Sequence, residues 1–206
     1  MELTLAITGA SGAIYAYRTL LRLATNKEVE QVNLIMSDAA CIVARVELGV
    51  DLREGGDARA INEWLGLDAT SKRVRVHRIK NLAAPPASGS YLQAGMIIAP
   101  CSMGTLGAIA SGAGYNLIHR AADVTLKEGR KLIIVPREAP YNQIHLENML
   151  RLSNAGARIV PASPSFYHRP QTIDELVDHL VFRILDQFGL GKAQASRWGQ
   201  EAAGIE

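Results

Sequence analysis

The chain has 206 residues, 48% of them hydrophobic, and a formal net charge of +2 at pH 7. This length and composition favour one compact domain with a substantial core, which we place at residues 1–190, followed by a C-terminal tail over residues 191–206. The balanced charge, without a basic run interleaved with aromatics, argues against a nucleic-acid partner. No apolar stretch approaches the roughly 20 residues that span a bilayer, and no signal-type segment is present, so we expect a cytoplasmic protein without membrane contact.

Cysteine and histidine usage excludes two further classes of protein. Cys41 and Cys101 are the only cysteines, which is too few for a disulfide framework. The five histidines are scattered and lack the spacing of metal ligands. We therefore predict no metal centre.

Short apolar runs that end in small, polar or glycine-rich loops dominate the chain. They predict buried strands over residues 3–7, 32–36, 96–99, 132–135 and 159–160, with a more exposed strand over residues 74–79. The fold predicted is an α/β fold with an open, doubly wound, mostly parallel sheet of the Rossmann-like kind. Such sheets bind ligands beyond the carboxyl ends of their strands, so the loops should converge on one active edge.

Helical patterns separate these strands. They predict helices over residues 13–24, 38–48, 58–67 and 116–128, and another that opens at residues 102–105. The clearest helix begins at Thr172, which forms a predicted capping box with Glu175, and ends at Gly189. Residues 81–90 are rich in proline and glycine and predict an ordered, irregular loop that could cover a site.

The turn from Gly9 to Gly12 lies where a strand gives way to a helix. Its backbone N–H groups and the helix dipole could bind an anion or a polar ring edge. The spacing is not that of a dinucleotide fingerprint, and no acidic residue ends the second strand, which disfavours dinucleotide binding. The simpler interpretation is a glycine turn that permits tight helix packing.

Hydroxyl residues occupy two more strand ends. Ser37 ends the second strand, and the segment from Ser102 to Thr105 opens a helix. Each serine alone is typical of an N-cap. Three such loops at one edge, without metal ligands, favour a cofactor held by backbone amides and hydroxyls, such as flavin mononucleotide (FMN).

Charged residues recur at helical spacing between residues 116 and 128. Arg120, Asp123 and Lys127 should share one helix face, since spacings of three, four and seven return to the same side. The simpler interpretation of this group is an exposed ion pair between Asp123 and Lys127.

Two other charged positions are harder to explain as surface residues. Arg137 and Glu138 directly follow a buried strand, where a charge is usually retained by a partner or a ligand. A cation beside an acid could bind a phosphate and protonate it. Arg183 flanks the apolar stripe of the last helix, so its guanidinium either reaches a pocket or extends to solvent.

Together these motifs resemble the flavin prenyltransferases, once named as the small subunit of 3-octaprenyl-4-hydroxybenzoate carboxy-lyase, a name from ubiquinone biosynthesis. The resemblance covers nearly the whole chain. It is carried by Gly9-Ala-Ser-Gly12, Ser37, Glu47, Ala84-Pro-Pro-Ala-Ser-Gly-Ser90, Pro100-Cys-Ser102, Arg120-Ala-Ala-Asp-Val124, Leu126-Lys-Glu128, Val135-Pro-Arg-Glu-Ala-Pro140, His145-Leu-Glu-Asn-Met-Leu150 and Phe166-Tyr-His-Arg-Pro-Gln171.

The resemblance implies a flavoprotein that transfers a dimethylallyl group from dimethylallyl phosphate to reduced FMN. The product, prenylated FMN, would serve a separate decarboxylase. The implied FMN contacts are Gly9, Ala10, Ser11, Ser37, Ser102, Met103, Gly104, Thr105 and Arg137. The implied contacts of the prenyl phosphate are Tyr167, Arg183, Lys127 and Arg120, with Glu138 near its phosphate.

These groups suggest a division of labour. Lys127, Arg137 and Arg183 would stabilise the departing phosphate without a metal ion. Glu138 would donate a proton to this phosphate. Ser11, together with Glu47 as a proton relay, would transfer the proton at the flavin ring. Without the resemblance, a helix-surface carboxylate is an equally good interpretation of Glu47.

Two features bear on how far the resemblance carries. Some relatives have tryptophan where this chain has Leu82, and leucine cannot shield an allylic cation as an aromatic ring does. The family commonly assembles as a dodecamer with sites between subunits, so we expect the tail, with its Arg197-Trp198 pair, to pack on a neighbouring subunit.

Two alternative functions remain at this point. One is an FMN-dependent decarboxylase of peptidyl-cysteine or pantothenoyl-cysteine type, which needs a catalytic histidine and a substrate clamp. The other is a non-catalytic flavin-binding subunit of a hydroxyarylic acid decarboxylase. Neither would need the whole set of phosphate-seeking side chains.

Overall fold

The computed structural model describes residues 1–52 and 57–191. Within them, six strands form one parallel sheet in the order β3-β2-β1-β4-β5-β6. The strands are β1 (Glu2–Ile7), β2 (Gln31–Met36), β3 (Val74–His77), β4 (Gly95–Cys101), β5 (Lys131–Pro136) and β6 (Arg158–Ile159). This is the strand order of a doubly wound Rossmann-type sheet, and it confirms the predicted fold.

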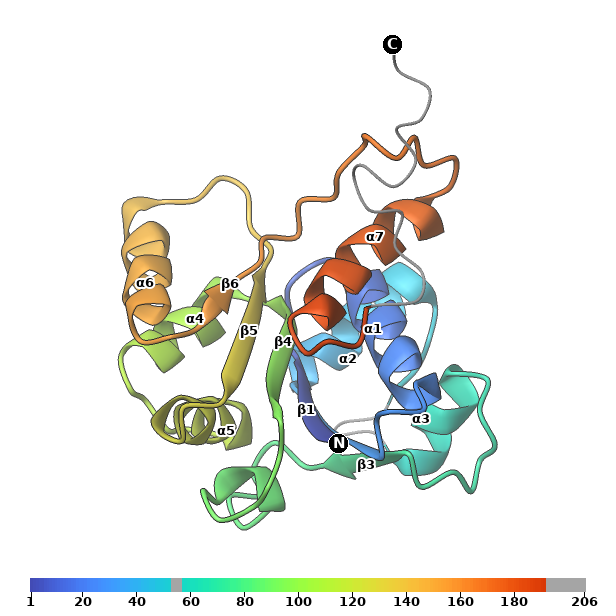
Figure 1. Ribbon diagram of the computed structural model, residues 1–206, viewed down its shortest axis with the longest axis horizontal. Coiled ribbons are helices and arrows are strands. Elements are labelled where there is room, and N and C mark those ends of the chain that lie inside the picture. Colours follow the sequence, from blue (N-terminus) through green and yellow to red (C-terminus); the bar gives the residue numbers. More distant parts are fainter. Residues whose placement is uncertain (53–56, 192–206) are drawn as a thin grey trace.

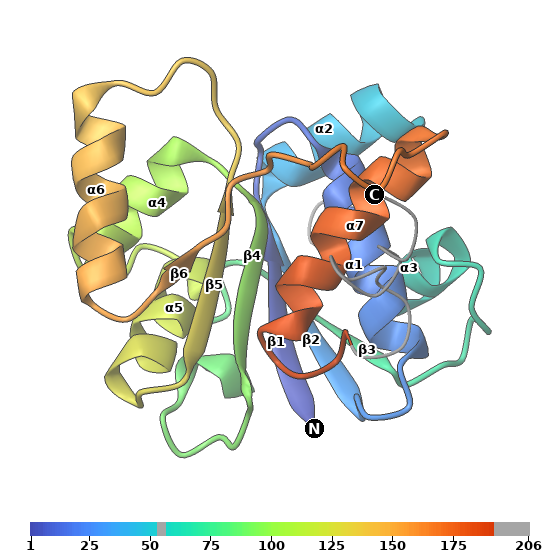
Figure 2. The same ribbon diagram turned by 45° about the horizontal axis from the view of Figure 1, so that its top comes forward.

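Helices cover both faces of the sheet (Figures 1 and 2). One face carries α1 (Ala13–Thr25), α2 (Asp38–Leu48), α3 (Ala58–Trp64) and α7 (Ile173–Asp186). The other carries α4 (Met103–Ala110), α5 (Leu117–Lys127) and α6 (Gln143–Asn154). Each face therefore buries its own apolar cluster.

The two clusters follow from the alternation of side chains along buried strands. In β1, Leu3 and Leu5 are fully buried in the cluster beneath α1 and α7, whereas Ala6 belongs to the cluster beneath α4 and α5. Because both faces are covered, the strands are apolar almost throughout. Most of the residues that could bind a ligand follow the strand ends, although Thr4 and Asn33 are fully buried polar residues within β1 and β2.

The structure differs from the sequence-based elements in several places. Helices α3 and α7 end at Trp64 and Asp186 rather than at residues 67 and 189, and β3 ends at His77 rather than at residue 79. Residues 81–90 contain a short 3-10 turn, η1 (Pro85–Ala87), which packs against α5. Helix α6 was not predicted, although its Asn142 cap accepts from the backbone N–H of His145. The capping box of α7 is half formed. Thr172 accepts from the Glu175 N–H at 3.1 Å, but the Glu175 carboxylate accepts from Gln171 instead.

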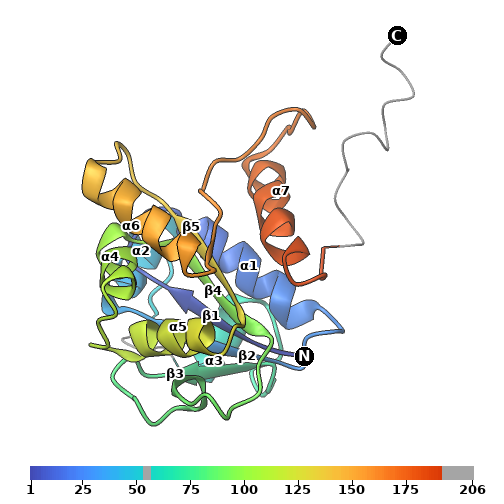
Figure 3. The same cartoon turned by 60° about the vertical axis from the view of Figure 1, so that its left-hand side comes forward.

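Helix α7 lies alongside α1 (Figure 3). On α7, Asp178 Oδ1 accepts from Arg18 Nε at 2.7 Å, and Asp178 Oδ2 accepts from Arg22 Nη2 at 2.6 Å and from Arg18 Nη2. Arg18 Nη1 reaches Asp174 at 3.1 Å. This ion-pair network fixes the helix that carries Arg183. The predicted role of the tail over residues 192–206 lies outside the described residues.

Candidate active site

The loops after β1, β2 and β4 meet at the carboxyl edge of the sheet, as the sequence predicts. The backbone N–H of Ser37 donates to Ile7 O at 3.0 Å. The backbone N–H of Ser102 donates to Thr8 Oγ1 at 2.8 Å. These bonds place the first turn between the starts of α2 and α4.

Gly9 is required at this edge by close packing. A Cβ atom at this position would lie 2.3 Å from Ala39 Cβ at the start of α2. No side chain fits at that distance, so the turn can approach α2 only as glycine. The packing interpretation of the turn is therefore correct for Gly9. Ala10 beside it is buried and Ser11 is exposed.

Glu47 occupies the N-terminus of α1. Its carboxylate accepts from the backbone N–H of Gly12 at 2.9 Å and from that of Ala13 at 2.7 Å. Burial raises the pKa of Glu47, but the hydrogen bonds from Ser11, Ala13 and Gly12, together with the charge of Arg137, outweigh it and lower the pKa below the ordinary value. Of the two groups expected at this helix end, an anion or a polar ring edge, the chain itself supplies an anion, the carboxylate of Glu47.

Glu47→Gln should lower the free energy of unfolding by up to about 1 kcal/mol at pH 7, because the side chain is exposed and its charge is screened. The lowered pKa means that the carboxylate stabilises the fold above the ordinary glutamate pKa of about 4.3 and loses this effect as pH falls through its folded value. Urea unfolding at several pH values checks this. If the difference in the free energy of unfolding between Glu47→Gln and the wild type were equally large at acid pH, the prediction would be wrong.

The start of α4 differs from that of α1. Ser102 Oγ accepts from the backbone N–H of Thr105 at 3.4 Å and donates to Thr105 Oγ1 at 3.1 Å, so the serine is an N-cap. A Cβ atom on Gly104 would meet nothing within 4 Å, and the first turn of α4 carries no acidic residue. This helix end has open space beside it. Ser37 is also an N-cap, accepting from Ala40 N–H at 3.1 Å.

Arg137 and Glu138 follow β5 at the same edge. Arg137 Nε donates to Ser11 O at 3.1 Å, which ties the β5 loop to the first turn. Glu138 is exposed, and its Oε1 accepts from the backbone N–H of Ala139 at 3.1 Å. Ser11, Glu47 and Arg137 are therefore brought together, with Glu138 next to them in the chain.

Tyr167 and Arg183 form a second group. Tyr167 lies in the segment between β6 and α7, and its hydroxyl is 2.9 Å from His179 Nε2 on α7. Arg183 follows His179 by one helical turn and pairs with Asp186 at 3.5 Å. His179 was not singled out from the sequence, although a histidine beside the apolar stripe of the last helix was a visible signal.

Lys127 is not brought to this edge within one chain. Lys127 ends α5 four residues before β5 begins, whereas Glu138 follows the end of β5. A six-residue strand places its ends roughly 20 Å apart, so Lys127 lies at the opposite edge.

The simpler ion pair predicted on α5 is also wrong. Asp123 pairs with Arg120 at 2.7 Å, and the partner of Lys127 is Glu128. Arg120 Nε also donates to Ala87 O at 3.2 Å. Helical spacing put these residues on one face of α5, but neighbours outside that pattern provided the partners.

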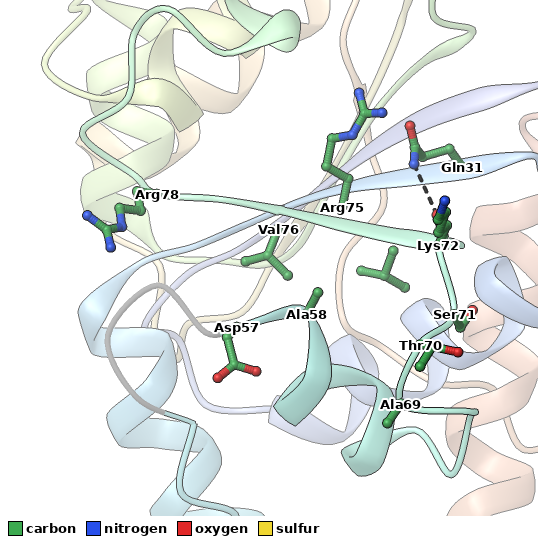
Figure 4. A pocket seen from close by; sticks show the side chains of 11 residues that line it. Gln31, Asp57, Ala58, Ala69, Thr70, Ser71, Lys72, Arg75, Val76 and Arg78 are labelled. Carbon is green, nitrogen blue, oxygen red and sulfur yellow. Dashed lines mark hydrogen bonds between the residues drawn. The ribbon is translucent and has the colours of Figure 1, made fainter.

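A pocket lies beside the edge strand β3 (Figure 4). It is lined by Asp57 and Arg75 among others, and Gln31 on its rim donates to Lys72 O at 3.0 Å. It contains none of the predicted site residues. Among the described residues, no cluster of histidine, cysteine or carboxylate side chains could hold a metal ion, and no helix is long and apolar enough to cross a membrane.

A doubly wound parallel sheet with an open helix N-terminus, hydroxyls and an arginine at its carboxyl edge defines the class of nucleotide-binding α/β proteins. Within this class the chain belongs to the flavoprotein family, whose sequence profile matches residues 1–185. More narrowly, it belongs to the flavin prenyltransferases. It is 49% identical to flavin prenyltransferase UbiX of Pseudomonas aeruginosa, over 97% of this chain and 95% of that protein.

Two solved structures are similar to this chain in both sequence and fold. The dodecameric FMN-dependent UbiX-like decarboxylase of Escherichia coli O157:H7 is 42% identical with a TM-score of 0.83, covering 96% of this chain and 99% of that one. AnUbiX (PadA1), crystallised with FMN and dimethylallyl pyrophosphate, is 38% identical with a TM-score of 0.83, covering 100% and 98% of the two chains.

Proposed function

We propose that this chain transfers a dimethylallyl group from dimethylallyl phosphate to reduced FMN, giving prenylated FMN for a partner decarboxylase. The observation that carries the proposal is the identity of 49% to a flavin prenyltransferase over nearly the whole chain. The geometry supports it, because Ser11, Glu47 and Arg137 meet at the edge where such a sheet binds its ligand.

The position of Glu47 decides how FMN should lie. Its carboxylate takes the N–H groups at the start of α1 and would repel a phosphate there. The uncharged edge of the flavin ring therefore belongs beside Gly9, Ala10 and Ser11, with Ser37 and Met103 close by. The FMN phosphate belongs at the start of α4, where Gly104 leaves space and the helix dipole is unopposed.

The chain's own residues then act on the donor phosphate and on the flavin proton. Reduced FMN supplies the nucleophilic ring. Glu138 hands a proton to the leaving phosphate, while Arg137, Arg183 and the Tyr167 hydroxyl stabilise its charge. Because the pKa of Glu47 is lowered, its carboxylate is a weak base, so we assign it to orienting the Ser11 hydroxyl rather than to accepting the proton.

A second subunit is needed to complete this site. Lys127 lies too far from Glu138 in one chain, and Arg120 is bonded to Asp123 on its own helix and to Ala87 of η1, so we propose that both reach the prenyl phosphate from a neighbouring copy. Exposed apolar side chains on α2 and α6, including Ile42, Val46 and Leu150, suit such contacts. The E. coli relative is described as dodecameric, and we propose the same assembly here.

Turnover should survive EDTA and should favour dimethylallyl monophosphate over the diphosphate. The reason is that arginine and lysine side chains supply the positive charge, and the described residues offer no carboxylate cluster for magnesium. Anaerobic assays with each donor, with and without EDTA, check this by chromatography of the flavin. The diphosphate seen with AnUbiX makes the donor comparison informative. Strict magnesium dependence would contradict the proposed chemistry.

The rival functions are less well supported. The described residues carry a set of phosphate-seeking groups that neither a cysteine decarboxylase nor a non-catalytic flavin subunit requires. We further propose that the enzyme works in the cytoplasm, because two cysteines in 206 residues are too few for the disulfide framework of a secreted protein.

A further inference from the structure

One histidine ring on α7 holds two residues of the segment that joins β6 to α7. His179 Nδ1 is 2.9 Å from Ser165 Oγ, and His179 Nε2 is 2.9 Å from the Tyr167 hydroxyl. The ring is 9% exposed and fixed by its helix, whereas Tyr167 is 50% exposed on a segment without regular structure. His179 is therefore the anchor, and Tyr167 is the group that it places.

The faces of the same ring are also in contact with this segment. His168 stacks on His179 with centroids 4.2 Å apart and planes at 11°, and the ring of Tyr167 stands edge-on to it at 5.2 Å. Neither ring nitrogen of His168 has a hydrogen-bond partner in the described part of the chain. His168 thus makes no hydrogen bond through its ring nitrogens, and the hydrogen bonds that attach the segment to His179 come from Ser165 and Tyr167.

The protonation state of His179 decides what Tyr167 can do. Burial, and then the neighbouring His168 and Arg183, lower the pKa of His179 below its ordinary value, which favours the neutral ring at pH 7. A neutral imidazole donates from one nitrogen and accepts at the other. If Nε2 were bare, the Tyr167 O–H would donate to it. If Nε2 carries the proton, the Tyr167 oxygen accepts and its own O–H proton is directed elsewhere.

The surroundings favour the second arrangement once a phosphate is present. Arg183 follows His179 by four residues, so the two side chains share one face of α7. A phosphate at Arg183 offers acceptor oxygens to the Tyr167 hydroxyl, and a bond between a neutral donor and a charged acceptor is stronger than one to a neutral imidazole. Ser165 can then donate to the bare Nδ1.

We propose that His179 is a positioning residue that holds Tyr167 through an Nε2–H donor and so aims the Tyr167 hydroxyl proton at the phosphate of the prenyl donor. This inference rests on the proposed function for the identity of the donor. It assigns His179 no contact with the flavin or with the reacting carbon. Its effect should appear in donor binding.

Two amide substitutions separate the two hydrogen bonds of the ring. The amide of His179→Gln can reach the place of Nε2 and keep the Tyr167 contact, whereas that of His179→Asn can replace only Nδ1 and keeps Ser165. Calorimetry of dimethylallyl phosphate binding to the FMN-loaded protein should give near wild-type affinity for His179→Gln. Affinity should be about tenfold weaker for His179→Asn, the scale of one hydrogen bond to a charged group.

Three controls make the assignment specific. Ser165→Ala should bind the donor almost as well as the wild type. Tyr167→Phe should weaken binding as much as His179→Asn, and combining the two should add little, because both remove the same contact. In turnover assays the loss should appear in KM rather than in kcat. FMN affinity should be unchanged in every variant.

Several results would overturn the proposal. One is that His179→Asn binds the donor as tightly as the wild type. Another is that His179→Gln and His179→Asn lose the same donor affinity. The third is that the losses of donor affinity in Tyr167→Phe and His179→Asn add up when the two substitutions are combined. If the variants misfold, the nitrogen-15 shifts of His179 in the wild type decide instead. The Nε2–H tautomer is expected after addition of inorganic phosphate, and an Nδ1–H tautomer refutes the proposal. If the variants show the expected donor affinities but the wild type forms no prenylated flavin, the proposed function is wrong while this inference is still supported.

Discussion

Glu138→Gln should lower the rate of prenylated-flavin formation by about 10²-fold or more, the usual scale of general acid catalysis. Glutamine keeps the shape of the side chain and can still accept from the backbone N–H of Ala139, as Glu138 does at 3.1 Å. It cannot donate a proton as a carboxylic acid. FMN affinity should remain nearly unchanged, because the substitution leaves the Arg137 contact with Ser11 in place.

Arg183→Ala is the matched control for this prediction. It removes a phosphate contact rather than a proton, so its loss should appear mainly as a raised KM for dimethylallyl phosphate that high donor concentration partly offsets. The pair of variants, measured by single-turnover kinetics and by equilibrium donor binding, separates proton transfer from binding. Normal turnover of Glu138→Gln would show that Glu138 is only a structural neighbour of Arg137.

Asp178→Ala should lower the free energy of unfolding by about 3 to 5 kcal/mol, the scale seen when one partner of a buried ion pair is removed. The side chain of Asp178 is 12% exposed and that of Arg18 is 17% exposed. Arg18 bonds both carboxylate oxygens of Asp178, and Arg22 shares one of them. Alanine would leave the Arg18 guanidinium largely buried without its main counter-charge.

Asp174→Ala provides the control on the same helix. Asp174 is 61% exposed in its side chain and makes one contact with Arg18, so its loss should cost less than about 1 kcal/mol. Urea unfolding of both variants measures the difference. If both variants lost the same small amount of unfolding free energy, the ion-pair network between α1 and α7 would contribute little to stability.

The same network predicts a pH dependence. Burial raises the pKa of Asp178, but hydrogen bonds and charges from Arg18 and Arg22 outweigh it and hold the pKa below the ordinary aspartate range. A lowered folded-state pKa stabilises the protein above the unfolded pKa, and this contribution disappears as pH falls through the folded value. The difference in the free energy of unfolding between the wild type and Asp178→Ala should therefore become smaller at acid pH.

The strands were predictable because each is an apolar run closed by a loop, and parallel strands share one carboxyl edge. That reasoning placed Ser37, Ser102 and Arg137 correctly at the edge of the sheet. It could not show that Glu47 would occupy the start of α1. A helix N-terminus attracts any anion, and nothing in the spacing between Gly12 and Glu47 tells a ligand from the chain itself.

For Lys127 the sequence predicted the helix face but not the edge of the sheet. Its helical spacing from Arg120 and Asp123 was correct, but spacing says nothing about which end of the sheet a residue faces. Its position just before β5 could have placed it at the far edge. His179 was missed because its importance comes from Ser165 and Tyr167, which lie outside its helix and reach it only in the folded chain.

The central claim is that this chain itself attaches a prenyl group to FMN. The most direct measurement is the mass of the flavin released after anaerobic incubation of the purified protein with reduced FMN and dimethylallyl phosphate. A flavin heavier by one dimethylallyl unit, absent when either substrate is omitted and strongly reduced with Glu138→Gln, is the predicted result. Recovery of unmodified FMN alone from protein that binds both substrates would contradict the claim.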